Sequence, residues 1–142
     1  MKPITKNIVF ISCMIVAGIT ACTKEKIVQY DGPDLVEFTA TAKTITTTAT
    51  PKEDSILVQL VGKQRTAAIS VTFQADAGST AVTPADYEVL TATPSIPANA
   101  SSGWIKFKFN KVTTQKTLKL VLTGGDNLKA SENFKTYTFT LK

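Results

Sequence analysis

Few side chains in this sequence could act as a nucleophile, a general base or a metal ligand. The 142 residues include no histidine, so the usual general base and the commonest zinc ligand are missing. Two carboxylate pairs are close in sequence, Glu53-Asp54 and Asp86 with Glu88, but both lie beside expected turns or strand ends, where acids are normally solvated. The segment VGKQRT lacks the spacing of a phosphate-binding loop. The residue types therefore predict a protein that is not an enzyme and that needs no cofactor.

Both cysteines of the chain, Cys13 and Cys22, lie near the N-terminus. A short basic stretch precedes an uncharged apolar run over residues 8–19, which is typical of a secretory signal and too short for a transmembrane helix. Cys13 lies inside this run and would be removed with it, so Cys22 would have no disulfide partner in the mature chain. The pattern predicts a signal peptide over residues 1–21.

The residues Ile19-Thr20-Ala21-Cys22 resemble a bacterial lipobox, which the lipoprotein signal peptidase cuts just before the cysteine. This resemblance implies that the thiol of Cys22 carries diacylglycerol and its amine a further acyl chain. Several acyl chains hold a protein at a membrane far better than one. The Lys-Glu-Lys that follows partly resembles the surface-export tag of Bacteroidota-type lipoproteins, which implies the outer membrane. The side of that membrane on which the domain lies stays open.

The predicted tether occupies residues 22–34, beginning at the lipidated cysteine. It has little apolar content and ends in Asp31-Gly32-Pro33-Asp34. Removal of the signal peptide takes away two lysines and no acidic residue, so the formal net charge falls from +5 to +3. A mildly basic chain without a clustered basic face gives no indication of nucleic-acid binding.

Apolar and polar residues alternate over most of the remaining sequence, as they do in half-buried β-strands. The alternation is clearest in five segments: 36–40, 69–73, 105–109, 118–122 and 137–141. Residues 56–61 are almost entirely apolar and are expected to be covered more fully. The threonine-rich segment 39–50 suits an exposed edge strand better than a disordered, glycosylated stalk, because threonine is a good strand former.

The connections between these segments indicate an all-β fold. Residues 62–65 and 110–115 are each expected to join their neighbouring strands as hairpins, and Gly124-Gly125-Asp126-Asn127 is a strong turn signal. Short strands with one apolar face need a second sheet to cover that face. We therefore expect a single antiparallel β-sandwich over residues 35–142.

The only tryptophan of the chain lies in the segment WIKFKFN. Because side chains alternate along a strand, a strand that directs Ile105 and Phe107 to the core directs Trp104 and Lys106 to the opposite face. Two interpretations stay open. Either a loop covers the Trp104 ring or the ring caps the sandwich, or Trp104 and Lys106 bind a sugar ring or a partner protein. These two residues are the candidate ligand-binding site.

From about Ser55 the order of elements resembles the Calx-β and related Ig-like families. ISVTFQADAGSTAVTPADYEVL supplies a strand and a loop that ends in Asp86-Tyr87. SIPANASSGWIKFKF supplies a turn and a strand, and SENFKTYTFTL the last strand. The resemblance implies an Ig-like sandwich. Together with the lipobox, the whole chain also resembles small Bacteroidota-type outer-membrane lipoproteins, which often accompany SusD-like glycan-uptake systems.

Calx-β domains bind calcium through clustered acids in loops at one end of the sandwich. Calcium takes about 6 to 8 oxygen ligands, commonly from several carboxylates. The matching positions here are Asp126 and Glu132, with Asp76 and Asp86 in an earlier loop. Solvated turn acids explain these residues better than a metal site does. Asp86 is instead expected to accept turn amides, with the ring of Tyr87 packed beneath the loop.

Two classes of function follow from these observations. The first is a non-catalytic, lipid-anchored binding module, for a glycan, beside a SusC/SusD-like uptake system. The second is a structural or protein-interaction lipoprotein that docks on an outer-membrane partner, with a weak calcium-binding adhesion domain as a variant. Exposed aromatic residues favour the first class, and a flat threonine and lysine face without aromatic residues favours the second.

Overall fold

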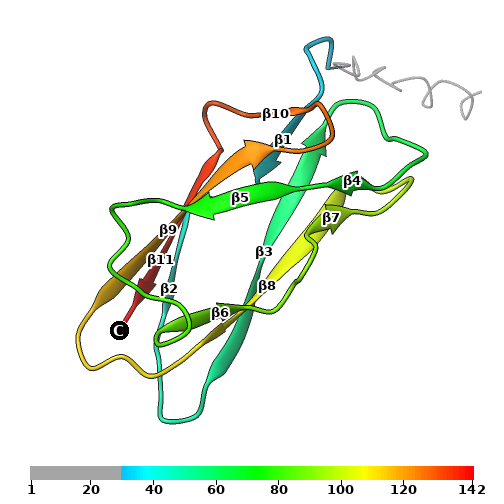
Figure 1. The fold of residues 1–142 in the computed structure, drawn as a ribbon. Helices are drawn as coiled ribbons and strands as arrows, with labels where there is room; N and C mark the ends of the chain where they lie inside the picture. Colours follow the sequence, from blue (N-terminus) through cyan, green and yellow to red (C-terminus); the bar gives the residue numbers. More distant parts are fainter. Residues whose placement is uncertain (1–29) are drawn as a thin grey trace, which may run out of the picture.

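The computed structural model describes residues 30–142 of the chain (Figure 1). The predicted signal peptide, Cys22 and most of the predicted tether lie outside these residues. Residues 30–142 form eleven strands and no helix. Accordingly, no helix in this part of the chain has the length and apolar character needed to cross a membrane.

Two sheets pack face to face to form a β-sandwich (Figure 1). The strands of the first sheet are β1 (Leu35–Phe38), β3 (Lys52–Val61), β6 (Tyr87–Val89), β8 (Ser102–Phe109) and β10 (Lys129–Ala130). Their order across this sheet, called the β8 sheet below, is β10-β1-β3-β8-β6. The strands of the second sheet are β2 (Ala42–Ile45), β5 (Thr72–Ala75), β9 (Lys116–Gly124) and β11 (Thr136–Leu141). Their order across this sheet, called the β9 sheet, is β2-β11-β9-β5.

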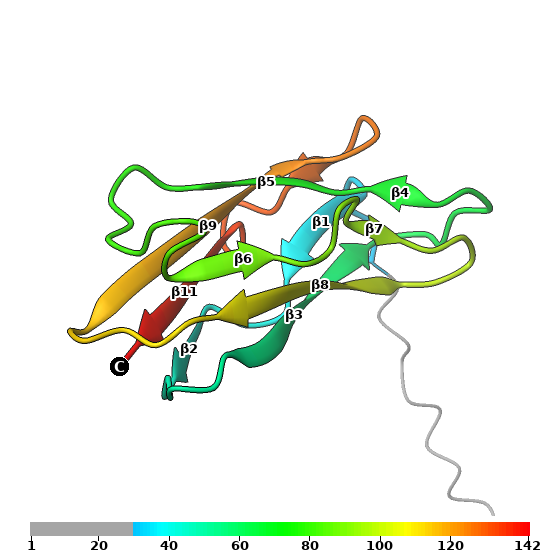
Figure 2. The ribbon, with the colours of Figure 1, turned by 60° about the horizontal axis from the view of Figure 1, so that its bottom comes forward.

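A third, two-stranded sheet consists of β4 (Ile69–Ser70) and β7 (Ser95–Ile96). Figure 2 shows this pair at one end of the sandwich, beside the start of β8. The predicted strand over residues 69–73 is therefore divided between two sheets, because β4 pairs with β7 whereas β5 pairs with β9. The register shifts between Thr72 and Phe73, where the chain passes into the β9 sheet.

Aromatic rings fill the centre of the core between the two sheets. The ring centroid of Phe139 on β11 lies 5.4 Å from that of Phe107 and 4.8 Å from that of Phe109, both on β8. All three side chains are fully buried, and Tyr137 adds a ring 4.9 Å from Phe139. Such tilted and edge-to-face contacts stabilise a core beyond the area that they bury. The predicted sandwich is confirmed, with its core built from the inward residues of the alternating segments.

The apolar segment 56–61 is covered fully on one face only. It lies in β3, between β1 and β8 in the middle of the β8 sheet. Ile56, Val58 and Leu60 are buried against the other sheet, whereas Leu57 and Gln59 are half-buried on the outer face. The strand itself is central, as its apolar character suggests.

Both predicted hairpins are wrong. Residues 62–65 leave β3 in the β8 sheet and lead to β4, and residues 110–115 connect β8 to β9 in the opposite sheet. These segments cross between sheets because each strand pairs with partners distant in sequence. The predicted turn at residues 124–127 does form: the backbones of Gly125 and Leu128 exchange hydrogen bonds of 3.1 and 2.8 Å. Asp126 and Asn127 have φ values of 45° and 66° there, the left-handed region that Asn and Asp tolerate best after glycine.

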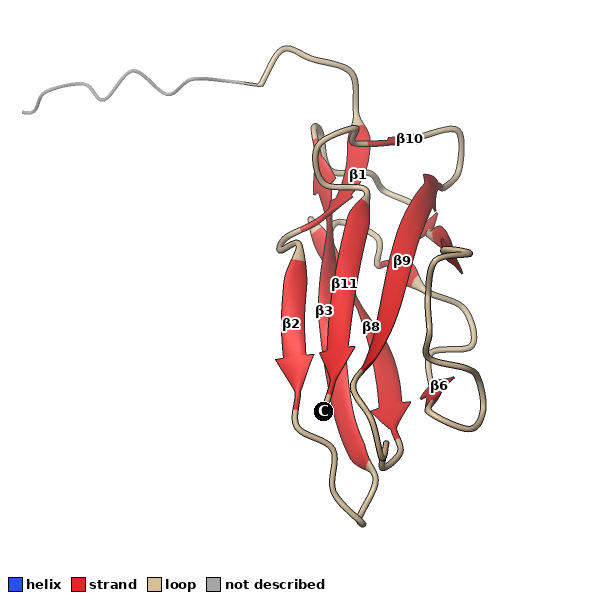
Figure 3. Cartoon of the chain, turned by 90° about the vertical axis from the view of Figure 1, so that its left-hand side faces the viewer, coloured by secondary structure: helices blue, strands red, loops and turns tan. Residues whose placement is uncertain are grey.

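Two strand pairs at the edges of the sheets are parallel, whereas the other pairs are antiparallel. β1 pairs with β10 in the β8 sheet, and β2 pairs with β11 in the β9 sheet (Figure 3). Each pair joins a strand from the N-terminal part of the domain to one from the C-terminal part. β2 therefore occupies an edge, as predicted for the threonine-rich segment.

Candidate functional site

The site predicted at Trp104 lies on the outer face of β8. Gly103, Ile105 and Phe107 are buried, whereas Trp104 and Lys106 are exposed, as strand alternation predicts. The Trp104 residue is 56% exposed, an unusual value for a large aromatic side chain in the interior of a strand. No loop of residues 30–142 therefore buries this ring, and its role as a ligand contact or as a cap on the sandwich stays a prediction.

Gly103 fixes the position of β8 immediately before the tryptophan. A Cβ atom at this residue would lie 2.0 Å from the carbonyl oxygen of Ser95 on β7, closer than any real contact. Only glycine therefore allows β7 to pass this close to β8. The packing holds the start of β8 from the inner side and leaves its outer side open at Trp104.

Three neighbours surround the exposed pair on the same sheet. Leu57 on β3 lies opposite Trp104 in the register and is half-buried. The N–H of Leu90, just after β6, donates to the carbonyl of Lys106 at 2.8 Å, and Leu90 is 41% exposed. The N–H of Lys106 donates in turn to Oγ1 of Thr91 at 2.8 Å. We call Leu57, Leu90, Trp104 and Lys106 the Trp104 patch.

The outer face of the β9 sheet has a different character. On β9 and β11 most outward side chains are threonines, and the others are Lys119 and Val121. The threonines are Thr117, Thr123, Thr136, Thr138 and Thr140. The exposed aromatic residues of the described chain are Tyr30, Trp104 and Phe134, and none belongs to a β9-sheet strand. The two faces thus match the two predicted classes of function separately.

Asp126 and Glu132, which we expect to be turn acids rather than metal ligands, are both bonded to other groups of the protein. Oδ2 of Asp126 accepts the N–H of Ser70, and Glu132 forms an ion pair with Lys135. The hydrogen bond from Lys135 and its charge hold the pKa of Glu132 below its usual 4.5. Within residues 30–142, no group of three or more Asp, Glu, His or Cys side chains is placed to hold a metal ion.

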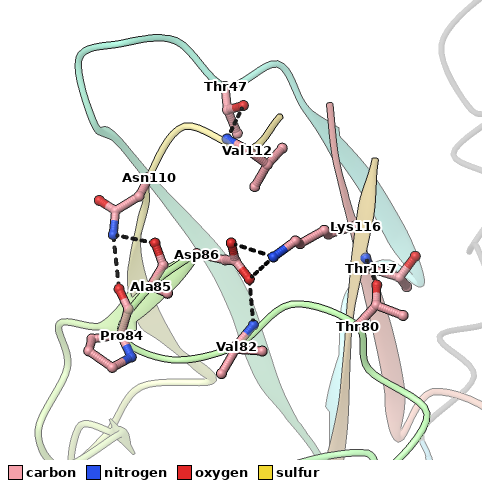
Figure 4. A network of polar contacts seen from close by, with 10 residues as sticks. All are labelled: Thr47, Thr80, Val82, Pro84, Ala85, Asp86, Asn110, Val112, Lys116 and Thr117. Atoms are coloured by element: carbon pink, nitrogen blue, oxygen red, sulfur yellow. Dashed lines mark hydrogen bonds and ion pairs between the residues drawn. The ribbon is translucent and has the colours of Figure 1, made fainter. Parts of the chain in front are cut away.

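Asp86 anchors a polar network just before β6 (Figure 4). This network lies near the end of β8, since Tyr87 pairs with Phe109, whereas β7 lies beside Gly103 at the start of β8. The carboxylate of Asp86 accepts the N–H of Val82 at 2.8 Å and the Nζ of Lys116 at 2.7 and 2.8 Å. The side-chain amide of Asn110 closes the same loop by donating to the carbonyls of Pro84 and Ala85. The loop between β5 and β6 is therefore held by both sheets.

The electrostatics of this network are those of a structural ion pair. Asp86 is only 5% exposed, and its burial raises the carboxyl pKa. The hydrogen bond and charge of Lys116, with the Val82 amide, outweigh that effect and keep the pKa of Asp86 below its usual 3.8. Tyr87 is buried next to it, as expected, and burial raises the pKa of its hydroxyl.

Three of the four carboxylates that are close in sequence, Asp54, Asp86 and Glu88, form ion pairs with lysines. Asp86 bonds to Lys116, whereas Glu88 bonds to Lys108 at 3.1 Å. Asp54 bonds to Lys43 at 2.8 Å. Catalysis by two carboxylates requires one of them to have a raised pKa, and Asp86 has a lowered one. The three acids serve as partners for lysines.

Comparison with solved structures places this geometry in a known fold. No protein family and no curated protein sequence matches the chain. A proposed carbohydrate binding protein from Bacteroides ovatus ATCC 8483 superposes with a TM-score of 0.59 at 8% identity, covering 76% of this chain and 36% of that protein. This chain thus corresponds to about a third of that protein's length.

Calx domains superpose as well. The apo form of the Calx CBD1 domain gives a TM-score of 0.62 at 14% identity, covering 78% of this chain and 96% of that domain. The calcium binding domain CBD12 of CALX1.1 gives 0.55 at 12% identity, covering 75% and 43% of the two chains. At these identities the likeness establishes the fold alone: the protein is a Calx-β-like β-sandwich.

Proposed function

We propose that this protein is a non-catalytic carbohydrate-binding module that stacks a sugar ring on Trp104. The observation that carries the proposal is the exposure of this indole ring near the start of β8, opposite the half-buried Leu57, with the exposed Leu90 beside Lys106. Flat aromatic rings with apolar flanks and a polar neighbour suit the C–H face of a sugar, and Trp is enriched at recognition sites. Similarity to the Bacteroides carbohydrate binding protein supports the same class of ligand.

The proposed setting is the outer membrane, with the module held through lipid on Cys22 as an accessory to a SusC/SusD-like uptake system. This part rests on the lipobox resemblance and on the composition of the chain. Copurification with a SusC/SusD-like pair from the native outer membrane would test this setting.

Docking on a partner protein is the second candidate, because the same exposed tryptophan could serve as an interface anchor. The threonine-rich face of the β9 sheet also fits this function. Binding to a polysaccharide distinguishes the two candidate functions, because only the first one requires it. Affinity electrophoresis and calorimetry would measure binding of the purified protein to xylan, mannan, laminarin, galactan and polygalacturonate.

The decisive variant is Trp104→Ala. We expect it to abolish binding to whichever polysaccharide the wild type retains. Phe134→Ala is the matched control, because Phe134 is an aromatic residue that is 41% exposed and whose carbonyl accepts the N–H of Phe38 on β1, two strands from β8. Binding that Trp104→Ala leaves intact, or no binding to any of the five glycans, would refute the proposed function.

Loss of binding must be separated from loss of folding. An exposed cross-strand pair such as Trp104 and Leu57 contributes up to about 1 kcal/mol, so we expect Trp104→Ala to lower the free energy of unfolding by about that amount. Phe107→Ala on the same strand removes a fully buried ring and should cost about 3–5 kcal/mol. Urea denaturation followed by circular dichroism measures both variants.

A further inference from the structure

The Trp104 patch carries one charge, and that charge has no partner in the structure. Lys106 is exposed and takes part in none of the ion pairs formed within residues 30–142. Lys108, the next lysine on the same face of β8, is already bonded to Glu88 at 3.1 Å. The two lysines therefore differ in what they can offer to a ligand.

The register explains why Lys106 is unpaired. Its neighbour across β3 is Ser55, and its neighbour on the β6 side is Leu90. Asp54, which directly precedes Ser55 on β3, is bonded to Lys43 of the other sheet. Glu37, farther across the β8 sheet on β1, is bonded to the side-chain amide of Gln59 at 2.7 Å. Glu53 lies opposite Lys108, one pair farther along the outer face of β3, and forms no ion pair with Lys106.

We infer that the Trp104 patch selects acidic sugars of the uronate class, an inference that rests on the proposed stacking of a sugar on Trp104. Residues two apart on one face of a strand are separated by about 6.5–7 Å. A uronate carries its carboxylate outside the sugar ring, so a ring on Trp104 can direct the carboxylate to the ammonium of Lys106. The flexible lysine stem lets the ammonium adjust to the position of the sugar.

The expected gain is moderate because the ion pair would be exposed. Exposed pairs contribute little individually and are screened by salt, since the Debye length falls from about 10 Å at 0.1 M to about 3 Å at 1 M. We therefore expect the acidic form of a glycan to bind about three- to tenfold more tightly than its neutral form at low salt. Most of this difference should disappear in about 1 M salt.

The test compares two ligands that have the same sugar backbone and differ at the carboxyl group, which is charged in one and a neutral methyl ester in the other. Polygalacturonate and its methyl ester share the same rings, but the ester carries no carboxylate. Wild type, Trp104→Ala and Lys106→Gln are titrated with both at low and high salt. Lys129→Gln is the matched control, because it removes the same charge from an exposed lysine of β10, at the far edge of the β8 sheet.

We expect wild type to prefer the acid form, Lys129→Gln to keep this preference and Lys106→Gln to lose it. We expect Trp104→Ala to lose all binding. Equal binding of both forms that depends on Trp104 would overturn the acidic selectivity and leave the proposed function standing. Equal losses in the two lysine variants, or acid binding that does not need Trp104, would show general charge attraction and overturn the inference. If only neutral glycans of the panel bind, the inference also fails, whereas no binding at all refutes the proposed function itself.

Discussion

Breaking the ion pair between Asp86 and Lys116 should destabilise the sandwich by an amount that depends on which partner is removed. The Asp86 side chain is 7% exposed and that of Lys116 is 30% exposed. Lys116→Met leaves a buried carboxylate with the Val82 amide as its remaining partner, and we expect a cost of about 3 kcal/mol, the lower end for a broken buried pair. Asp86→Asn keeps an acceptor for Val82 and leaves a lysine that can reach water, so we expect about 1 kcal/mol.

The pH dependence of the free energy of unfolding tests the same prediction in a second way. Because the pKa of Asp86 is lower in the folded protein than its usual 3.8, the ionised pair stabilises the fold above that value, and this contribution is lost as the pH falls through the folded pKa. Without Lys116, burial raises the pKa of the carboxyl by more than the hydrogen bond from the Val82 amide lowers it, so the pKa of Asp86 rises. The cost of Lys116→Met should therefore shrink between pH 7 and about pH 4, because a neutral Asp86 no longer needs the ammonium.

Urea denaturation followed by circular dichroism would measure the two single variants and the double variant Asp86→Asn/Lys116→Met. The double variant should cost at least about 1 kcal/mol less than the sum of the single variants, since the residues are in direct contact. A larger loss from Asp86→Asn than from Lys116→Met would refute the reasoning, as would strict additivity. Either result would mean that the buried carboxylate is solvated in a way the geometry does not indicate.

Three further predictions concern the anchor, metal binding and the support of β8. Cys22→Ser should abolish acylation and leave a soluble or uncleaved precursor; mass spectrometry of the membrane fraction checks this, and an unmodified Cys22 in wild-type membranes would contradict it. Calcium at about 1 mM should move the melting temperature little, because Asp126 and Glu132 have partners within the protein. A rise of about 4–8 °C, equivalent to about 1 kcal/mol, would reveal a site. Gly103→Ala should lower the free energy of unfolding by about 1–3 kcal/mol, measured in urea, because its methyl group would collide with the carbonyl of Ser95; no loss would show that β7 moves freely.

The strands could be predicted from the sequence, but most of their partners could not. Alternation in residues 105–109, 118–122 and 137–141 identified β8, β9 and β11, because a core between two sheets requires every second side chain to be apolar. Periodicity carries no information about which strands pair. The parallel pairs of β1 with β10 and of β2 with β11 depend on contacts between distant segments, and so do the crossings at residues 62–65 and 110–115.

For the candidate site too, the local pattern could be predicted from the sequence, but the neighbours across the sheet could not. Alternation alone placed Trp104 and Lys106 on the outer face, whereas Leu57 and Leu90 join the patch through cross-strand register that no local pattern specifies. Lys116 was missed although a signal existed. It has the same strand parity as the buried Leu118 and Leu120, and a lysine on the inward side of a strand needs a buried acid as its partner.

The pairing of β2 with β11 determines when this protein can fold. β11 (Thr136–Leu141) lies inside the β9 sheet, and the edge strand β2 (Ala42–Ile45) forms its backbone hydrogen bonds with β11. During synthesis, β2 therefore has no strand partner until β11 has been made, and long-range pairing of this kind is intrinsically slow. Because β2 lies at the edge of the β9 sheet and pairs there with β11, a chain cut anywhere between these two strands would hold β2 as an unpaired edge segment.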